Sequence, residues 1–318
     1  MRARLAMTVG DPRGIGPEVV AKALADSRVS ERCDVVVIGP EGVGIPVTES
    51  IGQWRPGSDA ALAGMLSGLA IERAVQMATE GLVDGIVTAP IDKSALYAGG
   101  YDFPGHTEML GALTGSSVAM MLASDKLRVV LATTHIPLSA VAENLSAASI
   151  VEAARITRDG LQEWFGIESP RIALCALNPH AGDGGRFGSE DAKLLEPAAR
   201  VAGIEGPFPA DTVFVRAMRG EFDAVIAPYH DVGMTAIKVA SFGNAVNVTL
   251  GLPFPRTSPD HGTALDIAGQ NRADPSSMIA ATLLCASIVS RAPQSGGRRV
   301  NAGPPPESRS SARPSRAQ

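Results

Sequence analysis

The sequence predicts an α/β protein whose sheet is largely parallel, arranged as two lobes or as one large unit. Three observations support this fold class. The chain has 318 residues, which is more than one ordinary hydrophobic core requires. Hydrophobic residues make up 45% of it and charged residues 19%, as in globular proteins. Short apolar runs alternate with segments of helical length along the chain, which is the pattern of βα units.

The predicted strands are short, mostly aliphatic runs. Aromatic residues are only 4% of the chain, so Ala, Val, Leu and Ile must build the core. Runs that are apolar throughout are typical of parallel strands covered on both faces. The strands expected on this basis are Leu5–Val9, Val35–Ile38, Gly85–Ala89, Arg128–Thr133, Arg171–Ala176, Ala224–Ala227 and Ala245–Leu250.

Helices are expected between these strands. Pro17 suits the first turn of a helix that continues to Ala25, because proline lacks an N–H that this position leaves unbonded anyway. Four longer segments have the length and composition of helices: Ala60–Thr79, Ser146–Phe165, Ser189–Ala202 and Pro275–Ser290.

The last 27 residues, 292–318, differ from the rest in composition and charge. They are rich in Pro, Ser, Gly and Arg, and their five Arg and one Glu give a net charge of +4. The whole chain carries −5, so residues 1–291 carry −9. We expect a disordered basic tail behind an acidic body, which argues against nucleic acid as a partner.

The cysteines and the hydropathy pattern indicate in which cellular compartment the protein is expected. Cys33, Cys175 and Cys285 are far apart and lie in apolar runs, so buried, reduced thiols are expected. No CxxC pair is present, which argues against a thiolate metal site. No apolar run approaches the roughly 18 residues that a membrane span needs. We therefore expect a cytoplasmic protein with no membrane association.

Histidines indicate where the chemistry lies. There are five, and three of them, His135, His180 and His230, follow apolar strand runs directly. Ligands of open α/β sheets bind at the carboxyl ends of strands, so these three side chains are expected in one crevice. Three neutral imidazoles suit a divalent metal with open coordination positions. The alternative is that each histidine only caps a turn, and spacing does not decide between the two.

A second group of residues suits an anionic ligand. Arginine and lysine bind phosphate or carboxylate oxygens, and the glycines and prolines around these residues indicate loops near strand ends. His106 and Thr107 are expected in a turn, within GHTE. The group comprises His106, Thr107, Lys238, Asn247 and Arg256.

Two glycine-containing loops are further candidates. Residues 10–18, GDPRGIGPE, lie between a predicted strand and a helix, although they match neither the dinucleotide fingerprint nor a P-loop. Glycines allow a close approach of backbone to a ligand, and the helix that follows favours anions at its N-terminus. Residues 260–275, DHGTALDIAGQNRADP, form a loop that can wrap an adenine–ribose. A tight connection without a ligand is the alternative for both.

Taken together, seven stretches resemble the 4-hydroxythreonine-4-phosphate dehydrogenase family and its sugar-acid relatives. They run in order from residue 10 to about residue 269, and the last is also similar to the adenosine loop of isocitrate and isopropylmalate dehydrogenases. The stretches are GDPRGIGPE, TAPIDK, YDFPGHTE, ATTHIPL, LNPHAGDGGRFGSED, DAVIAPYHDVGM and NVTLGLPFPRTSPDHGTALDIAG.

The resemblance implies the fold and its division into lobes. A two-lobed isocitrate/isopropylmalate dehydrogenase-like fold with a cleft between the lobes is expected. Residues 1–128 with 255–291 would form the cofactor-side lobe, and residues 129–254 the second lobe with the dimer contact. The family implies a homodimer in which both subunits contribute to each metal site.

The resemblance also assigns roles to residues. The metal ligands would be His135, His180 and His230, holding one divalent ion per site (Zn, Mg, Co or Mn). The substrate-binding residues would be His106, Thr107, Lys238, Asn247 and Arg256. NAD or NADP would meet His261, Gly262, Thr263, Ala264, Asp266 and Asn271. For catalysis, Lys238 is expected to bind phosphate or relay a proton. Apart from the resemblance, Asp231 and Asp260 adjoin two of the histidines, and either could orient an imidazole or only form a turn. Of the two, Asp231 is the predicted catalytic residue.

The reaction implied is the oxidation of 4-hydroxythreonine 4-phosphate to a β-keto acid that then loses carbon dioxide, a step of pyridoxal phosphate biosynthesis. The sequence departs from the family pattern at Ala89, Val232 and Pro255, and residues 39–60 are short for the family. Three alternatives therefore stay open. They are the same chemistry on 4-phospho-threonate or 4-phospho-erythronate, a non-catalytic metabolite-binding homologue, and a metal-dependent lyase or isomerase without redox change.

Overall fold

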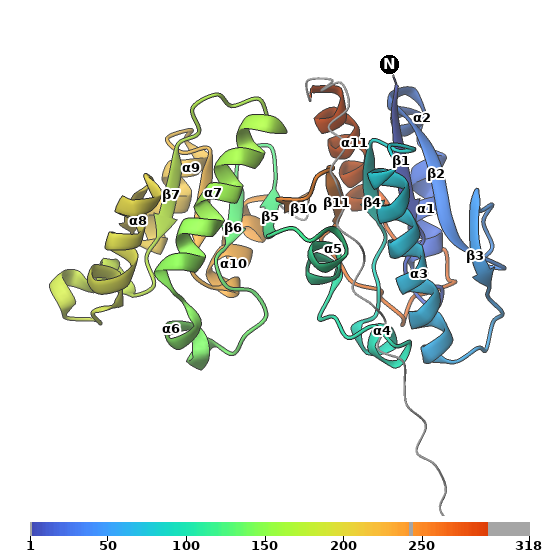
Figure 1. Cartoon of the computed structure of the whole chain (residues 1–318), viewed down its shortest axis with the longest axis horizontal. Helices are drawn as coiled ribbons and strands as arrows, with labels where there is room; N and C mark the ends of the chain where they lie inside the picture. The colour runs from blue at the N-terminus through green and yellow to red at the C-terminus, as the bar shows by residue number, and fades with distance from the viewer. Residues whose placement is uncertain (1, 242–243, 292–318) are drawn as a thin grey trace, which may run out of the picture.

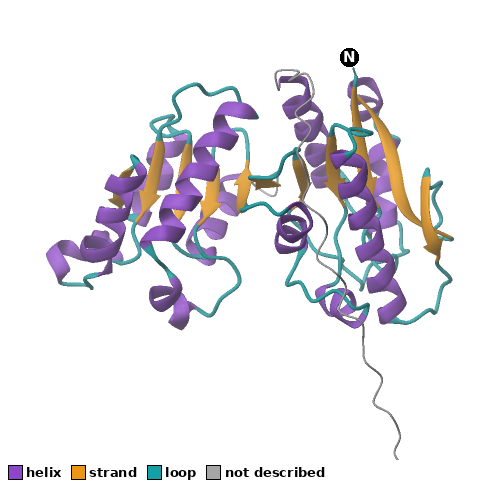
Figure 2. Ribbon diagram, in the orientation of Figure 1, coloured by secondary structure: helices purple, strands orange, loops and turns teal. Residues whose placement is uncertain are grey.

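A computed structural model describes residues 2–241 and 244–291 of the chain. The expected tail, residues 292–318, lies outside the described residues. Within them the protein is α/β, with eleven strands in one sheet in the order β3-β2-β1-β4-β11-β10-β5-β6-β9-β7-β8 (Figures 1 and 2). The strands are β1 Ala3–Thr8, β2 Cys33–Glu41, β3 Glu49–Gln53, β4 Gly85–Thr88, β5 Ala119–Ala123, β6 Arg128–Leu131, β7 Ile172–Cys175, β8 Glu205–Phe208, β9 Ala224–Ala227, β10 Val246–Leu250 and β11 Arg256–Pro259.

The sheet consists of two parallel groups joined by antiparallel strands. One group is β3, β2, β1, β4 and β11, and the other is β6, β9, β7 and β8. Between them, β10 runs antiparallel to both β11 and β5, and β5 runs antiparallel to β6. Figure 1 shows β10 and β5 in the middle of the molecule, with helices gathered around each group on either side. The predicted α/β class with a mostly parallel sheet is confirmed.

Helices cover both groups of strands. Those longer than one turn are α1 Gly16–Leu24, α2 Ser27–Arg32, α3 Ala60–Thr79, α4 Lys93–Ala98, α5 His106–Thr114, α6 Val141–Asn144, α7 Ala147–Glu163, α8 Glu196–Ala202, α9 Ala210–Met218, α10 His230–Ser241 and α11 Ser276–Arg291. Shorter or irregular turns are η1 Leu138–Ala140, η2 Pro179–Gly185 and the π-helical η3 Asp191–Leu195. The described part of the chain contains no helix suited to spanning a membrane.

Local sequence explains the elements that were predicted well. The boundaries of α3 are those expected, because Asp59 accepts a hydrogen bond from the backbone N–H of Leu62 and so caps the helix. The helix α7 begins after Ser146, which forms a capping box with Ser149. The interior strands β1, β4 and β9 are buried along almost their whole length, as continuous apolar runs predict.

Two expectations about local structure were wrong. Four strands, β3, β5, β8 and β11, were not predicted, since β11 reads Arg-Thr-Ser-Pro and carries no apolar run. His106 and His230 were expected in loops or turns, but each begins a helix, α5 and α10. Gly105 precedes His106 and supplies no side-chain cap, so the usual sequence signal for a helix start is missing there.

The hydrophobic core extends through both groups of strands and is built mainly of aliphatic side chains. The three cysteines lie in it as free, buried thiols, as expected. Burial raises the pKa of the Cys175 and Cys285 thiols to about 12. Thiols in this environment stay protonated and unreactive near neutral pH.

Candidate active site

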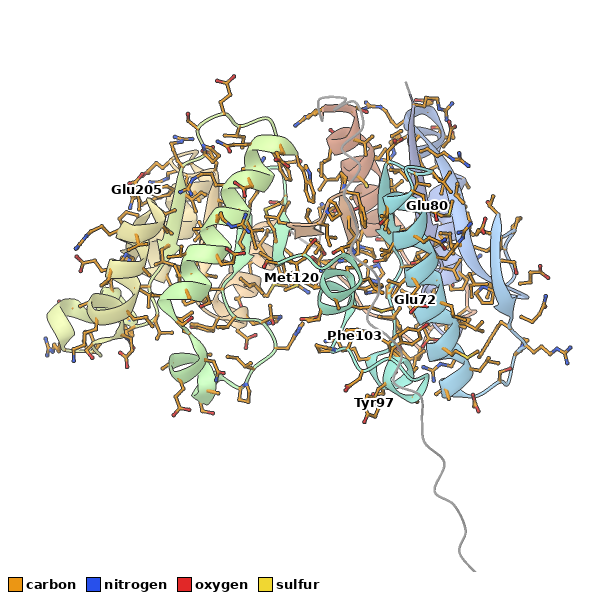
Figure 3. The ribbon with its side chains drawn as sticks, in the orientation of Figure 1. Glu72, Glu80, Tyr97, Phe103, Met120 and Glu205 are labelled. Carbon is orange, nitrogen blue, oxygen red and sulfur yellow. The ribbon has the colours of Figure 1, made fainter. Side chains whose placement is uncertain are left out.

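A cavity of about 630 Å³ lies between the two groups of strands. Chain segments that follow β4, β6, β9 and β11 reach it, so strand ends from both groups converge on one space although the groups are separated by antiparallel strands. Met120 of β5 lines it, and Figure 3 shows this side chain in the middle of the molecule. Its polar lining residues include Thr88, Lys93, His106, Thr107, Glu108, His135, His230, Thr235, Lys238, Asn247, Arg256, Ser258, Asp260 and His261.

Arg256 is the most unusual residue of this cavity. It begins β11, is only 1% exposed, and is the largest fully buried side chain of the described residues. Its guanidinium donates hydrogen bonds to the hydroxyls of Thr249 and Thr88, while its Nε is buried without a partner. Burial lowers the pKa of this arginine to about 9. A buried cation held by hydroxyls rather than by a carboxylate is suited to receive an anionic ligand.

Two further predicted substrate residues have unsatisfied polar atoms here. The Nε2 of His106 and the Oδ1 of Asn247 are both buried and have no hydrogen-bond partner in the protein. Burial, together with the charges of Arg256 and Lys93, holds the pKa of His106 well below its ordinary value. Thr107 lies next to His106 in the first turn of α5. Buried polar atoms without partners cost free energy unless a ligand completes them, so these atoms indicate a binding site.

Lys238 lines the cavity from α10 and is linked to Asp260. Its Nζ lies 3.9 Å from Oδ2 of Asp260 and donates to the Asp260 carbonyl oxygen at 3.4 Å. Asp260 follows β11 and is mostly buried, with 11% of its side chain exposed. The charge of Lys238 is therefore partly balanced by a carboxylate, which sets it apart from Arg256.

His135 and His230 meet at the cavity. Their ring centroids are 5.5 Å apart, although the two residues follow different strands, β6 and β9. The Nδ1 of His230 lies 2.7 Å from Oδ1 of Asp231, which leaves Nε2 as its free ring nitrogen. Asp231 is itself largely exposed and is not a lining residue, so its contact with the cavity runs through His230. A carboxylate behind an imidazole is the common arrangement for a metal-binding histidine.

The third predicted ligand, His180, does not join them within one chain. It lies in η2, is exposed, and its ring contacts Phe187 at a centroid distance of 6.1 Å. The segment between β7 and α8, which contains η2, forms the left edge of the molecule in Figure 1. A single copy of the chain therefore does not bring the three histidines together, and their convergence in one crevice stays a prediction. The cause of the separation is sheet order, because β7 is separated from β6 by β9.

The backbone around His180 is strained and firmly held. His180, Ala181 and Asp183 have positive φ angles of 54°, 54° and 43°, a region that costs non-glycine residues free energy. Asp191, only 1% exposed, fixes the start of the segment by accepting bonds from the Leu177 and Asn178 N–H groups at 2.8 and 3.0 Å. Exposed, strained and anchored residues of this kind are typical of functional sites.

The expected cofactor loop lies beside the first glycine-rich loop. Ile15 donates its backbone N–H to the Thr263 carbonyl at 2.9 Å, and a Cβ on Gly14 would come within 2.7 Å of that oxygen. The glycine thus allows the two backbones to pack together. His261 and Gly262 line the cavity, and the Nε2 of His261 is buried without a partner. Thr263, Ala264 and Asp266 do not line it, and Asn271 lines a separate hollow of about 740 Å³.

Sequence reasoning did not single out several polar residues of the cavity. They are Thr88, which bonds Arg256, and two charged residues, Lys93 and Glu108. Lys93 and Glu108 belong to the TAPIDK and GHTE stretches, so their position in those motifs was the available signal. The departures Val232 and Pro255, by contrast, are not lining residues. Ala89 does line the cavity.

Within the described residues, no group of three or more His, Cys, Asp or Glu side chains is arranged to hold a metal ion. His135 and His230 supply two imidazoles, and the orientation of His230 by Asp231 fits a metal ligand.

Comparisons with known proteins show which chains this one is similar to. A 4-hydroxythreonine-4-phosphate dehydrogenase from Desulfosudis oleivorans is 44% identical, over 88% of this chain and 94% of the relative. The crystal structure of such an enzyme from Klebsiella pneumoniae matches with a TM-score of 0.81 and 37% identity, over 90% of this chain and 99% of that one. A terephthalate 1,2-cis-dihydrodiol dehydrogenase from Burkholderia xenovorans matches with a TM-score of 0.64 and 28% identity, over 90% and 98%.

The family model for the pyridoxal phosphate biosynthetic protein PdxA matches residues 17–285, which include every residue discussed for the cavity. A match over this much of the chain, with relatives above 40% identity, establishes the family. The chain belongs to the family of the pyridoxal phosphate biosynthetic protein PdxA.

Proposed function

We propose that this oxidoreductase oxidises 4-hydroxythreonine 4-phosphate and that the resulting β-keto acid loses carbon dioxide. Relatives that carry this enzyme's name align over most of their length. The observation that carries the proposal is Arg256, a buried cation on the cavity whose guanidinium has no carboxylate partner among the described residues. A substrate with anionic ends completes this charge and the unpartnered atoms of His106 and Asn247.

The cavity residues divide into binding and proton-handling roles. Arg256, Asn247, His106 and Thr107 would hold the anionic and polar groups of the substrate and so fix the reacting carbon. Lys238, which is hydrogen-bonded to Asp260, would give or take the proton of the substrate hydroxyl or of the product enolate. Asp231 acts through His230, whose ring it orients, and is a positioning residue.

A divalent ion (Zn, Mg, Co or Mn) and NAD or NADP would supply, when bound, polarisation of the substrate oxygens and acceptance of a hydride. His135 and His230 would hold the ion on this chain. His261 and Gly262 would meet the nucleotide near the reacting carbon, since they line the cavity. Thr263, Ala264, Asp266 and Asn271 would bind its remaining part along the same loop.

We further propose that a second copy of the chain completes the metal site. His180 is exposed on a strained and anchored segment but lies off the cavity of its own chain. In a homodimer, His180 of one copy would join His135 and His230 of the other. The lobes expected from the sequence, 1–128 with 255–291 and 129–254, would then form the walls of each site.

The direct test is turnover of the purified protein. With 4-hydroxythreonine 4-phosphate, NAD and a divalent ion, we expect reduced nicotinamide and carbon dioxide to form in equal amounts. The same assay with 4-phospho-threonate, 4-phospho-erythronate and a cis-dihydrodiol compares the other substrates. Preference for any of these, or product formation that does not depend on NAD or NADP, would overturn the proposal.

A further inference from the structure

Lys93 is a cation of the cavity that the proposed roles do not yet use. It begins α4, directly after the segment that follows β4, and lines the cavity together with His106, His135 and Arg256. The positive charge of Lys93 helps to lower the pKa of both His106 and His135. Lys93 is itself solvent-exposed, so it lines the open rim of the site.

The position of Lys93 is fixed by its helix. The side chain of Asp92 caps α4 by accepting a hydrogen bond from the Ala95 N–H at 2.7 Å. Ala95 and Leu96 are buried, and a Cβ on Gly64 of α3 would come within 1.7 Å of the Ala95 carbonyl oxygen. The short helix thus packs directly against the backbone of α3. Its first residue is held at the rim of the cavity.

Lys93 has no ion-pair partner within the part of the chain that the structure describes. No carboxylate there forms an ion pair with it, and neighbouring Asp92 is engaged by Ala95 and by Arg13 at 3.6 Å. Glu108 lies nearby, since a Cβ on Gly105 would be 3.5 Å from its Oε2 and 3.7 Å from Lys93 Cε. Lys238 differs, because Asp260 lies beside it.

A second anion-favouring feature lies at the same place. Helix α5 begins at His106 and has nine residues, and Gly105 gives its first turn no side-chain cap. Gly105, His106, Thr107 and Glu108 all line the cavity, so the uncapped backbone N–H groups of this turn are close to it. A helix N-terminus favours phosphate, and the unpartnered, buried Nε2 of His106 independently indicates a ligand there.

We propose that Lys93 is a substrate-specificity residue, which binds the phosphate of the substrate against the first turn of α5. Arg256, deeper in the cavity, then binds the carboxylate end. This inference rests on the proposed function and assigns the two anionic ends of the substrate to two separate cations. It leaves Lys238 free for proton transfer. Lysine is a common ligand for phosphate, where it acts as a point charge.

The experiment compares two substrates in three variants. Turnover of 4-hydroxythreonine 4-phosphate and of 4-hydroxythreonine, which lacks the phosphate, is measured for the wild type, Lys93→Met and Lys93→Arg. Loss of a charge-assisted contact should raise the KM for the phosphorylated substrate roughly tenfold or more in Lys93→Met. The kcat/KM for the substrate without phosphate should stay within about twofold, and Lys93→Arg should recover most of the loss.

The matched control is Lys126→Met, which removes an exposed lysine from the β5–β6 turn, away from the cavity. Equal losses for the two substrates in Lys93→Met, or no loss, would overturn the inference. Failure of the proposed function looks different, because the wild type itself then shows no turnover. In that case, calorimetric binding of inorganic phosphate decides: weaker binding to Lys93→Met than to Lys126→Met supports the inference, and equal binding refutes it.

Discussion

The segments after β9 and after β7 invite comparison, because each places a histidine directly beyond a buried strand of the same parallel group. After β9, His230 is half-buried, begins a regular helix and lies 5.5 Å from the ring of His135. After β7, His180 is exposed, has a left-handed backbone and lies off the cavity. A histidine that follows a buried strand can therefore lie at the cavity or away from it. One histidine lines the cavity of its own chain, and the other is exposed away from it.

The difference shows how a strand's place in the sheet changes the role of its terminal residue. The strand β9 pairs with β6, whose end reaches the cavity, whereas β7 pairs with β9 and the edge strand β8. A residue one strand further from the cavity can act there only by way of another molecule. The strain at His180 and the anchoring by Asp191 support such an outward role.

The largest expected effect comes from removing each histidine in turn. His180→Ala and His230→Ala should each abolish turnover, because each would leave the metal one ligand short. Mixing the two inactive proteins under conditions of subunit exchange should restore about a quarter of wild-type activity, since half of the dimers are mixed and each mixed dimer has one intact site. The measurement is steady-state activity before and after exchange.

A control for this experiment is the mixture of His135→Ala with His230→Ala. These two residues lie on the same side of the proposed shared site, so no intact site can form and no activity should return. Activity that returns in the control mixture, or that does not return when His180→Ala is mixed with His230→Ala, would show that His180 does not complete the metal site of a second copy.

On the cavity side, Arg256→Met should lower kcat/KM by about 100-fold, as expected when a buried, charge-assisted contact is lost. The free energy of unfolding of the ligand-free protein should stay equal or increase, because no carboxylate is left unpaired by the change. Activity assays and urea denaturation measure the two effects. A large loss of stability would mean that Arg256 is structural rather than a ligand contact.

In the segment after β7, Asp191→Ala should destabilise the protein by about 2 to 3 kcal/mol, because the Leu177 and Asn178 N–H groups lose their buried acceptor. Turnover should fall as well, since the segment that carries His180 loses its anchor. Asp191→Asn, which keeps one acceptor oxygen, should cost less in both measurements. Unchanged activity in a folded Asp191→Ala protein would argue against positioning of His180.

The smallest expected effect concerns pH. His106 stays neutral in the folded protein because its pKa is held well below 6.5, whereas the unfolded chain takes up the proton near that value. Above pH 6.5 this histidine is neutral in both states and adds no pH dependence, whereas below pH 6.5 the unfolded chain binds the extra proton and the free energy of unfolding falls. The slope from one such group is at most about 1.4 kcal/mol per pH unit. Denaturation curves of His106→Gln should show a correspondingly flatter dependence.

Much of the fold was predictable because its elements carry local signals. The helix Ala60–Thr79 was expected within its observed limits, and the strand Ala224–Ala227 likewise. The antiparallel centre of the sheet was not, because β11 is polar and β5, Ala-Met-Met-Leu-Ala, lacks β-branched residues. Strand order is a long-range property that no local pattern records.

The site was predictable to a similar extent. Sequence reasoning pointed to His106, His135, His230 and Arg256, which the structure places on one cavity. It did not foresee the outward position of His180, which follows from the position of β7 in the sheet, between β9 and the edge strand β8. It also passed over Lys93 and Glu108, since a lone charged residue after a strand resembles ordinary surface charge until the cavity is seen.

The continuity of the sheet has a practical consequence for dissecting this protein. Backbone ladders run without a break from β3 to β8, so cutting the chain between residues 128 and 129 would separate β5 from β6 and strip paired strands of their neighbours. Newly bare strand edges are templates for aggregation. Either half produced alone should therefore be insoluble, so the two groups of strands are best studied together in the intact chain.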